Sequence, residues 1–162
     1  MNGSATPLDR GFASLAYVMP LASALSVGLP FFSFLNEQAP QVLKIFSLLL
    51  LPVMPLIEIE RSGFWGLIIF IALFAFVVQN TNISRFIRFN VLQAILVSFV
   101  ISVGGLAVGI LGPLTQGLLG ETLLNVLFLG GMAIVVYSIV QSVLGRYAEI
   151  PTISEAINMQ LP

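Results

Sequence analysis

Residues 83–94 read ISRFIRFNVLQA, and they gather polar side chains at a point where the chain on both sides is apolar. Arg85 and Arg88 lie three residues apart, and Asn90 and Gln93 follow with the same spacing. A strongly apolar run continues directly after them. The stretch therefore predicts the mouth of a long hydrophobic helix, and its two arginines help to orient the other apolar runs in a membrane.

The composition predicts an integral membrane protein. Of the 162 residues, 58% are hydrophobic and 8% are charged, whereas a soluble domain carries about a quarter charged residues. Six Lys and Arg against seven Asp and Glu leave no basic surface for nucleic-acid phosphates. The chain has no Cys and no His, which removes thiolate and imidazole chemistry. We therefore expect no catalytic, cofactor or metal site and no nucleic-acid partner.

Four apolar runs predict an all-α membrane fold with four transmembrane helices. At about 1.5 Å per residue they approach or exceed the roughly 30 Å of a bilayer core. The predicted spans are residues 12–34, 63–79, 89–111 and 123–144. Pro20 and Pro30 predict a kink in the first span. The small residues at 22–24 also fit a secretory cleavage site, but the apolar character continues to Phe34, which favours an uncleaved span.

A fifth apolar run, residues 43–57, is ambiguous. Lys44 lies inside it and Pro52 and Pro55 interrupt helical bonding, so we expect a re-entrant or interfacial segment. That arrangement places on one side of the membrane Arg10, Arg85, Arg88 and Arg146, and on the other Lys44 and Arg61. The bias predicts that both termini are cytoplasmic or stromal. If the run spans, the bias shrinks, and this alternative stays open.

Small residues recur along the third span at spacings of three and four. They are Ala94, Ser98, Ser102, Gly105, Gly109 and Gly112. On a helix they form a stripe about 80° wide, which allows another helix to approach closely. We expect a helix-packing seam, with the lining of a pore as the alternative. The fourth span offers a matching face in Gly131, Ser138, Ser142 and Gly145.

The tail, residues 146–162, turns polar. Thr152 and Glu155 have the spacing of a capping box and predict a short amphipathic helix. Because no Lys or Arg follows Arg146, we expect this helix to dock on protein or to lie shallowly at the interface. The sequence shows no internal repeat, so residues 1–162 are expected to form a single membrane domain.

Two interpretations compete for the polar group Arg85, Arg88, Asn90 and Gln93. In the favoured one, the arginines hold the loop at the headgroups and the amides make interhelical hydrogen bonds worth about 1 kcal/mol or less each. In the other, the four side chains form a polar vestibule or a docking surface for a partner subunit.

Three separated segments carry a family resemblance. They are AYVMPL at 16–21, RFIRFNVLQA at 85–94, and YAEIP at 147–151 followed by SEA at 154–156 and QLP at 160–162. Together they resemble the Tic-twenty (Tic20) family, multispanning subunits of the translocon at the inner envelope membrane of chloroplasts and their cyanobacterial homologues. The resemblance marks Tyr147, Glu149, Pro151 and Glu155 as a C-terminal motif.

The resemblance implies a channel-forming or core component of preprotein translocation. Its implied partners are other membrane subunits or further copies, preprotein substrates and the lipid bilayer. The first ten residues are unlike an Arg-rich transit peptide, which favours a cyanobacterial plasma or thylakoid membrane or a plastid-encoded inner envelope protein. The rival interpretation is an assembly factor or accessory subunit of a larger, for example photosynthetic, membrane complex. A small-solute transporter is least favoured, because the spans lack charged residues.

Overall fold

The computed structural model describes residues 5–112 and 117–161, and every regular element in these ranges is helical. The elements, in order, are α1 (Pro7–Ala16), α2 (Val18–Val27), α3 (Leu29–Gln38), α4 (Pro40–Leu50), α5 (Met54–Arg61), α6 (Phe64–Ala72), the π-helical η1 (Leu73–Val78), α7 (Arg85–Ile110), α8 (Leu118–Val143) and α9 (Ile153–Gln160).

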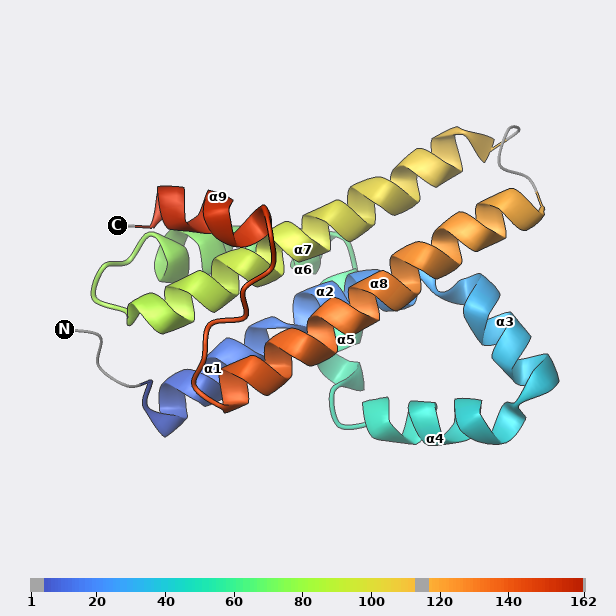
Figure 1. Cartoon of the computed structure of the whole chain (residues 1–162), viewed down its shortest axis with the longest axis horizontal. Coiled ribbons are helices and arrows are strands. Elements are labelled where there is room, and N and C mark those ends of the chain that lie inside the picture. The colour runs from blue at the N-terminus through green and yellow to red at the C-terminus, as the bar shows by residue number, and fades with distance from the viewer. Residues whose placement is uncertain (1–4, 113–116, 162) are drawn as a thin grey trace.

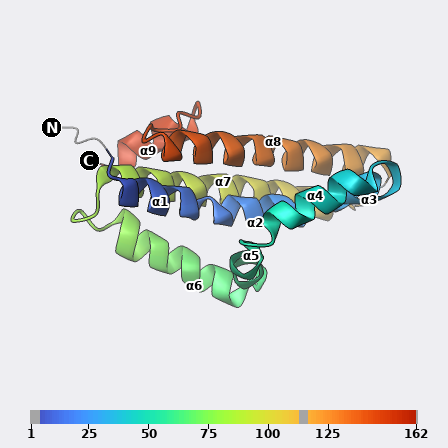
Figure 2. The ribbon, with the colours of Figure 1, turned by 90° about the horizontal axis from the view of Figure 1, so that it is seen from below.

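Three long rods form the centre of the molecule. α7 and α8 run antiparallel, and α1 with α2 forms a nearly continuous rod that packs against both (Figures 1 and 2). α7 and α8 have 26 residues each, or about 39 Å, and are apolar enough to cross a membrane. The side chains buried between the rods include Tyr17, Phe89 and Val135.

The first predicted span is bent next to Pro30, one of the two prolines from which a kink was predicted. The axis turns by 68° between Pro7–Val27 and Leu29–Gln38. Pro30 lacks the donor that would continue α2 into α3. A Cβ atom at Gly28 would lie 2.7 Å from a ring carbon of Phe128, so a side chain at the bend would displace the aromatic ring of α8. Residues 12–34 are therefore not one straight span.

The chain between α3 and α7 is broken into shorter pieces than the sequence predicts. Within residues 43–57 the helix is interrupted near the two prolines, because α4 ends at Leu50 and α5 begins at Met54. The predicted span at 63–79 is an apolar helix over Phe64–Val78, whose 15 residues cover about 22 Å as an α-helix. By length and composition, the described residues contain two spanning helices, or three if the bent first pair counts as one.

Three of the arginines gather at one end of the bundle. α1 and α7 begin, and α8 ends, at the same end of the bundle, so Arg10, Arg85 and Arg146 lie there together (Figure 1). Arg61 differs from its prediction. It ends α5, which lies about halfway along the bundle rather than at the opposite end (Figure 2). The cause is the break at residues 51–53, after which Ile57 packs α5 against α2 and becomes 1% exposed.

The outer surface of the bundle is apolar along its length. Large hydrophobic side chains stand exposed on every long element, for example Leu49, Phe76, Ile110 and Leu118. A soluble monomer rarely exposes apolar surface on this scale. Together with the two long apolar helices, this surface indicates a membrane location.

Candidate functional site

A cluster of neutral polar side chains lies buried where the three rods meet. Asn90 on α7 is fully buried, and its Oδ1 accepts hydrogen bonds from the Tyr17 hydroxyl and the Ser142 hydroxyl, each at 2.9 Å. Its Nδ2 donates to the Phe86 carbonyl oxygen at 2.8 Å. One amide therefore ties the α1–α2 junction to α7 and α8. We call Tyr17, Asn90, Gln93, Ser138 and Ser142 the polar cluster.

Gln93 occupies the next turn of α7 and is equally buried. Its Nε2 donates to the Ser138 hydroxyl at 3.4 Å, whereas its Oε1 has no hydrogen-bond partner in the part of the chain that the structure describes. A buried acceptor without a donor costs about 1–3 kcal/mol. Gln93 Oε1 is therefore a buried acceptor of the cluster for which the described residues supply no donor.

A second set of hydroxyls lies farther along the α2–α7 interface. The Ser23 and Ser98 hydroxyl oxygens are 2.6 Å apart, and the Ser102 hydroxyl donates to Ser23 at 3.4 Å. Ser23 was not among the predicted site residues, and neither was Tyr17. Each sits in an apolar run whose hydrophobicity gives no sign of a polar partner.

The small-residue stripe is packed against a neighbouring helix as far as Gly105 and lies open beyond it. Ala94 and Ser98 are buried, and a Cβ at Gly105 would lie 2.7 Å from Val27, so the stripe meets α2. A Cβ at Gly109 or Gly112 would meet nothing within 4 Å.

The matching face of α8 also serves more than one neighbour. Ser138 and Ser142 meet the amides of α7, whereas a Cβ at Gly131 would contact both Ala24 on α2 and Ile101 on α7. At the end of α8, a Cβ at Gly145 would lie 2.8 Å from Arg10. The close helix approach predicted for this face thus involves the α1–α2 rod as much as α7.

Arg88 is buried and holds the end of the short apolar helix. Its Nε donates to the Val78 carbonyl oxygen at 2.8 Å, at the C-terminal end of η1, where a positive charge also meets the favourable end of the helix dipole. The same side chain lines a cavity of about 430 Å³ with Gln79, Thr81 and Gln160. Arg88 therefore joins α7 to η1 and faces a partly polar cavity.

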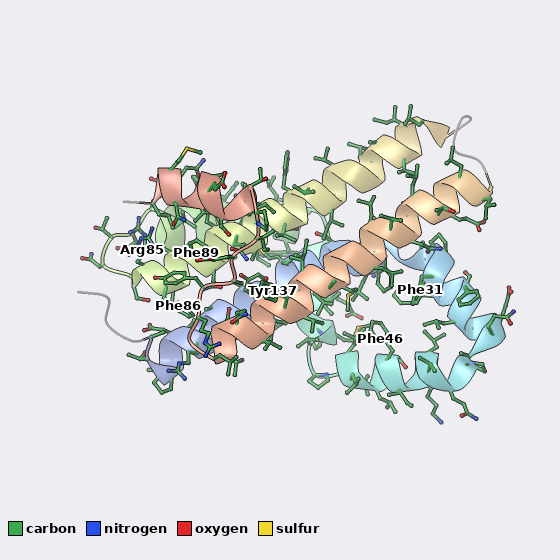
Figure 3. All side chains as sticks on the ribbon, in the orientation of Figure 1. Phe31, Phe46, Arg85, Phe86, Phe89 and Tyr137 are labelled. Atoms are coloured by element: carbon green, nitrogen blue, oxygen red, sulfur yellow. The ribbon has the colours of Figure 1, made fainter. Side chains whose placement is uncertain are left out.

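Arg85 joins α7 to the C-terminal segment. Its Nη2 donates to Asn158 Oδ1 at 3.0 Å, and its Cζ lies 5.9 Å from the centre of the Tyr147 ring, within cation–π range. Tyr147 also packs edge-on against Phe86 and Phe89, with ring centres 5.3 and 4.9 Å apart. Figure 3 shows Arg85, Phe86 and Phe89 together where α7 begins.

The C-terminal helix docks on α7, in line with one of its two predicted positions, with Ile157 and Leu161 buried. Its predicted capping box is wrong. Thr152 has a φ of 68° and its side chain makes no capping bond, because that conformation departs from the extended geometry of a cap. Instead, Ser154 Oγ accepts from the Ile150 N–H at 2.7 Å.

Three members of the C-terminal motif face outward. Glu149, Pro151 and Glu155 are exposed, and neither glutamate side chain makes a hydrogen bond or ion pair with another described side chain. Only Tyr147 of the motif contributes to packing against α7. The motif therefore combines one docking residue with an accessible acidic surface.

The polar cluster offers neutral hydrogen-bond donors and acceptors rather than reactive groups. In the described ranges, no set of three or more His, Cys, Asp or Glu side chains is placed to hold a metal ion. Hydroxyls and amides of this kind can join helices, or can receive polar groups such as a peptide backbone when the helices separate.

Comparisons with known proteins point in one direction. Residues 8–157 match a family described as chloroplast import apparatus Tic20-like. A "Tic20 family protein" of Synechocystis sp. is 47% identical over 163 residues, covering 99% of this chain and 97% of that protein. "Protein TIC 20-II, chloroplastic" of Arabidopsis thaliana is 31% identical over 96% of this chain and 74% of its own length. "Tic20 family protein Ycf60" of Gracilaria tenuistipitata var. liui is 32% identical over 96% and 76%.

Proposed function

The chain belongs to the Tic20 family, and from this we propose that it is a non-enzymatic core component of a complex that moves proteins across or into a cyanobacterial or plastid membrane. The polar cluster is the observation that carries the proposal. It joins two buried amides of α7 to hydroxyls of the α1–α2 rod and of α8, at an interface that all three rods share. A membrane subunit that is purely a spacer has no need of such an interface.

We propose four membrane crossings with both termini on the cytoplasmic or stromal side. The first is α1–α2, and the third and fourth are α7 and α8. The second crossing is made of several short helices. α4 covers the first part of the distance and α6 with η1 covers the rest, an arrangement that Figure 2 supports. The orientation follows from Arg10, Arg85 and Arg146, which share one end of the bundle, because an excess of positive residues is typical of the cytoplasmic side.

The proposed mechanism is a separation of the α1–α2 rod from α7 and α8. In the packed state the hydroxyls of Tyr17 and Ser142 both donate hydrogen bonds to Asn90 Oδ1. When the rods part, these groups become free to bond to a passing polypeptide, whose backbone would otherwise face hydrocarbon without partners. One short chain supplies few polar groups for a pore wall, so conduction is expected to need further copies or partner subunits.

Reconstitution tests this proposal. The purified chain in liposomes, alone and with subunits that co-purify from native membranes, is expected to give a conductance that responds to precursor peptides. The variant Asn90→Leu keeps a similar side-chain volume and removes the acceptor, and we expect it to alter that response. Tyr137→Phe on the outer face of α8 is the matched control. No peptide response in any combination of subunits argues against a translocation role.

The outward C-terminal motif favours one second candidate, an accessory or assembly subunit. Glu149, Pro151 and Glu155 are accessible in a segment that is itself docked on α7. A photo-crosslinker at Glu149 in native membranes distinguishes the two functions. Crosslinks to precursors in transit support translocation, whereas stoichiometric crosslinks to one resident complex support the accessory role.

A further inference from the structure

The charged helix α5 lies at an unexpected depth. Leu56 and Ile59 of α5 line a cavity of about 470 Å³ together with Met19 of α2. At about 1.5 Å per residue, Met19 lies roughly 18 Å along the α1–α2 rod from Pro7 and roughly 12 Å from Val27. Both views place α5 about halfway along the bundle (Figures 1 and 2). If the bundle axis follows the membrane normal, α5 sits near the middle of the bilayer.

Among the side chains of α5 that the structure describes, one packs against the bundle and two charged ones stand exposed. Ile57 is buried against α2, whereas Glu58 and Arg61 are exposed. Neither charged side chain makes a hydrogen bond or ion pair with any side chain that the structure describes. Ionisable groups at this depth are costly when they face lipid, and in membrane proteins they almost always face protein, water or one another.

We propose that α5 is a self-association surface, at which Glu58 of one copy pairs with Arg61 of a second copy and the reverse pair forms by two-fold symmetry. Glu58 and Arg61 are three residues apart and lie about 60° apart around the helix. A two-fold axis between them brings each charge onto its opposite. The surface is therefore complementary to itself.

Charge complementarity favours a second copy over the other occupants. A partner surface of one sign would satisfy one side chain and repel the other. Hydrocarbon would satisfy neither. Next to α5, the exposed rings of Phe64 and Trp65 pack edge-on with centres 5.6 Å apart. They supply an apolar rim that would shield the two ion pairs, as aromatic residues commonly do in interfaces.

The surface is separate from the polar cluster, so this inference goes beyond the translocation proposal and does not depend on it. α5 packs on the outer side of the α1–α2 rod and on α6, whereas the polar cluster lies between the rods. Self-association through α5 leaves the α7–α8 interface untouched.

Charge reversal with cross-complementation tests the proposal. Two copies of the full chain with different tags are co-expressed, and one tag is used to capture the other from lipid nanodiscs. In Glu58→Lys both contacts become Lys opposite Arg, and in Arg61→Glu both become Glu opposite Glu. Each variant alone is expected to lose at least about tenfold in self-capture. When the two variants are mixed, both pairs are attractive again and capture returns to within about twofold of the native level.

The mixture also controls for folding, because a misfolded variant cannot be recovered by its partner. Glu121→Lys, which reverses an exposed charge in the first turn of α8, is the matched control and should leave self-capture unchanged. Native self-capture by either single variant, or no recovery in the mixture, overturns the proposal.

A water-filled crevice at α5 is the alternative outcome. The chain has no Cys, so Glu58→Cys introduces a single thiol for a membrane-impermeant reagent. Fast labelling together with no self-capture of the native chain would show that water, and not a second copy, solvates α5. That result also overturns the proposal.

Discussion

Removing the two hydroxyls that donate to Asn90 should be more damaging together than separately. Tyr17→Phe deletes one donor to Asn90 Oδ1 and leaves the Ser142 hydroxyl in place, and Ser142→Ala does the opposite. Interhelical hydrogen bonds in membranes average about 0.6 kcal/mol with a maximum near 1.7. We therefore expect each single variant to lose roughly 0.5–1 kcal/mol of unfolding free energy.

The double variant strands a fully buried amide oxygen. An unsatisfied buried acceptor costs about 1–3 kcal/mol, so the loss should exceed the sum of the single losses by about 1 kcal/mol or more. The assay is reversible unfolding of the reconstituted chain in bicelles, run as a double-mutant cycle. Tyr137→Phe is the control, since Tyr137 is 41% exposed on the outer face of α8, and it should change stability by less than about 0.5 kcal/mol. Losses that add within about 0.3 kcal/mol would refute the shared-acceptor arrangement.

Three further variants test individual contacts. Gly28→Ala forces a Cβ to within 2.7 Å of an aromatic ring and should lower the free energy of unfolding by about 1–3 kcal/mol. Gly109→Ala has open space at its Cβ, so it should leave stability unchanged or raise it by up to about 1 kcal/mol. Equal effects of the two variants in unfolding assays would be inconsistent with the bend. Arg88→Ala removes the donor to the Val78 carbonyl oxygen and should lower the free energy of unfolding by about 1.5–3 kcal/mol. Amide hydrogen exchange in η1 should become faster, and unchanged exchange there would contradict the contact. Thr152 has a positive φ of 68°, a conformation that glycine adopts without strain, so Thr152→Gly should stabilise the tail by about 1 kcal/mol. Proteolysis of the tail should then be slower, and faster cleavage would argue against strain at that residue.

The sequence predicted the long apolar helices well. The predicted span at 89–111 falls within α7 except for its last residue, and that at 123–144 corresponds to α8 to within a few residues at each end. Uninterrupted apolar runs of this length have few alternatives to a spanning helix, because each backbone group must bond within its own segment. Both helices begin earlier than predicted, by four and five residues. At α7 the reason is Ser84, whose side chain accepts a hydrogen bond from the Ile87 N–H, a cap that hydropathy does not register.

Proline placement was harder to interpret. Pro52 was expected to interrupt one re-entrant segment, but the chain uses the interruption to end α4 and to start α5 in a new direction. The position of Arg61 followed from that turn. Hydrophobicity measures how long an apolar segment is, but the direction taken after a break depends on tertiary contacts such as Ile57 against α2.

The stripe of small residues predicts which face of α7 another helix can approach, but it does not identify that helix. Gly105 meets Val27 on α2, and Ser98 meets Ser23 on the same helix. α8 would satisfy the same pattern, because its own small residues have the same kind of spacing. For the polar cluster, Asn90 and Gln93 stood out as amides entering an apolar helix, whereas Tyr17 became visible only when the rods were brought together.

Crosslinking to a precursor arrested in transit tests the translocation proposal most directly. A photoreactive residue at Gln93, inside the polar cluster, is expected to crosslink to the arrested precursor in native membranes and to give no such product when no precursor is in transit. The same residue at the exposed position of Tyr137 should crosslink mainly to lipid or to neighbouring subunits. Crosslinks from Gln93 that stay confined to α8 and to the Tyr17 region, with the precursor present or absent, would contradict a role for this interface in protein translocation.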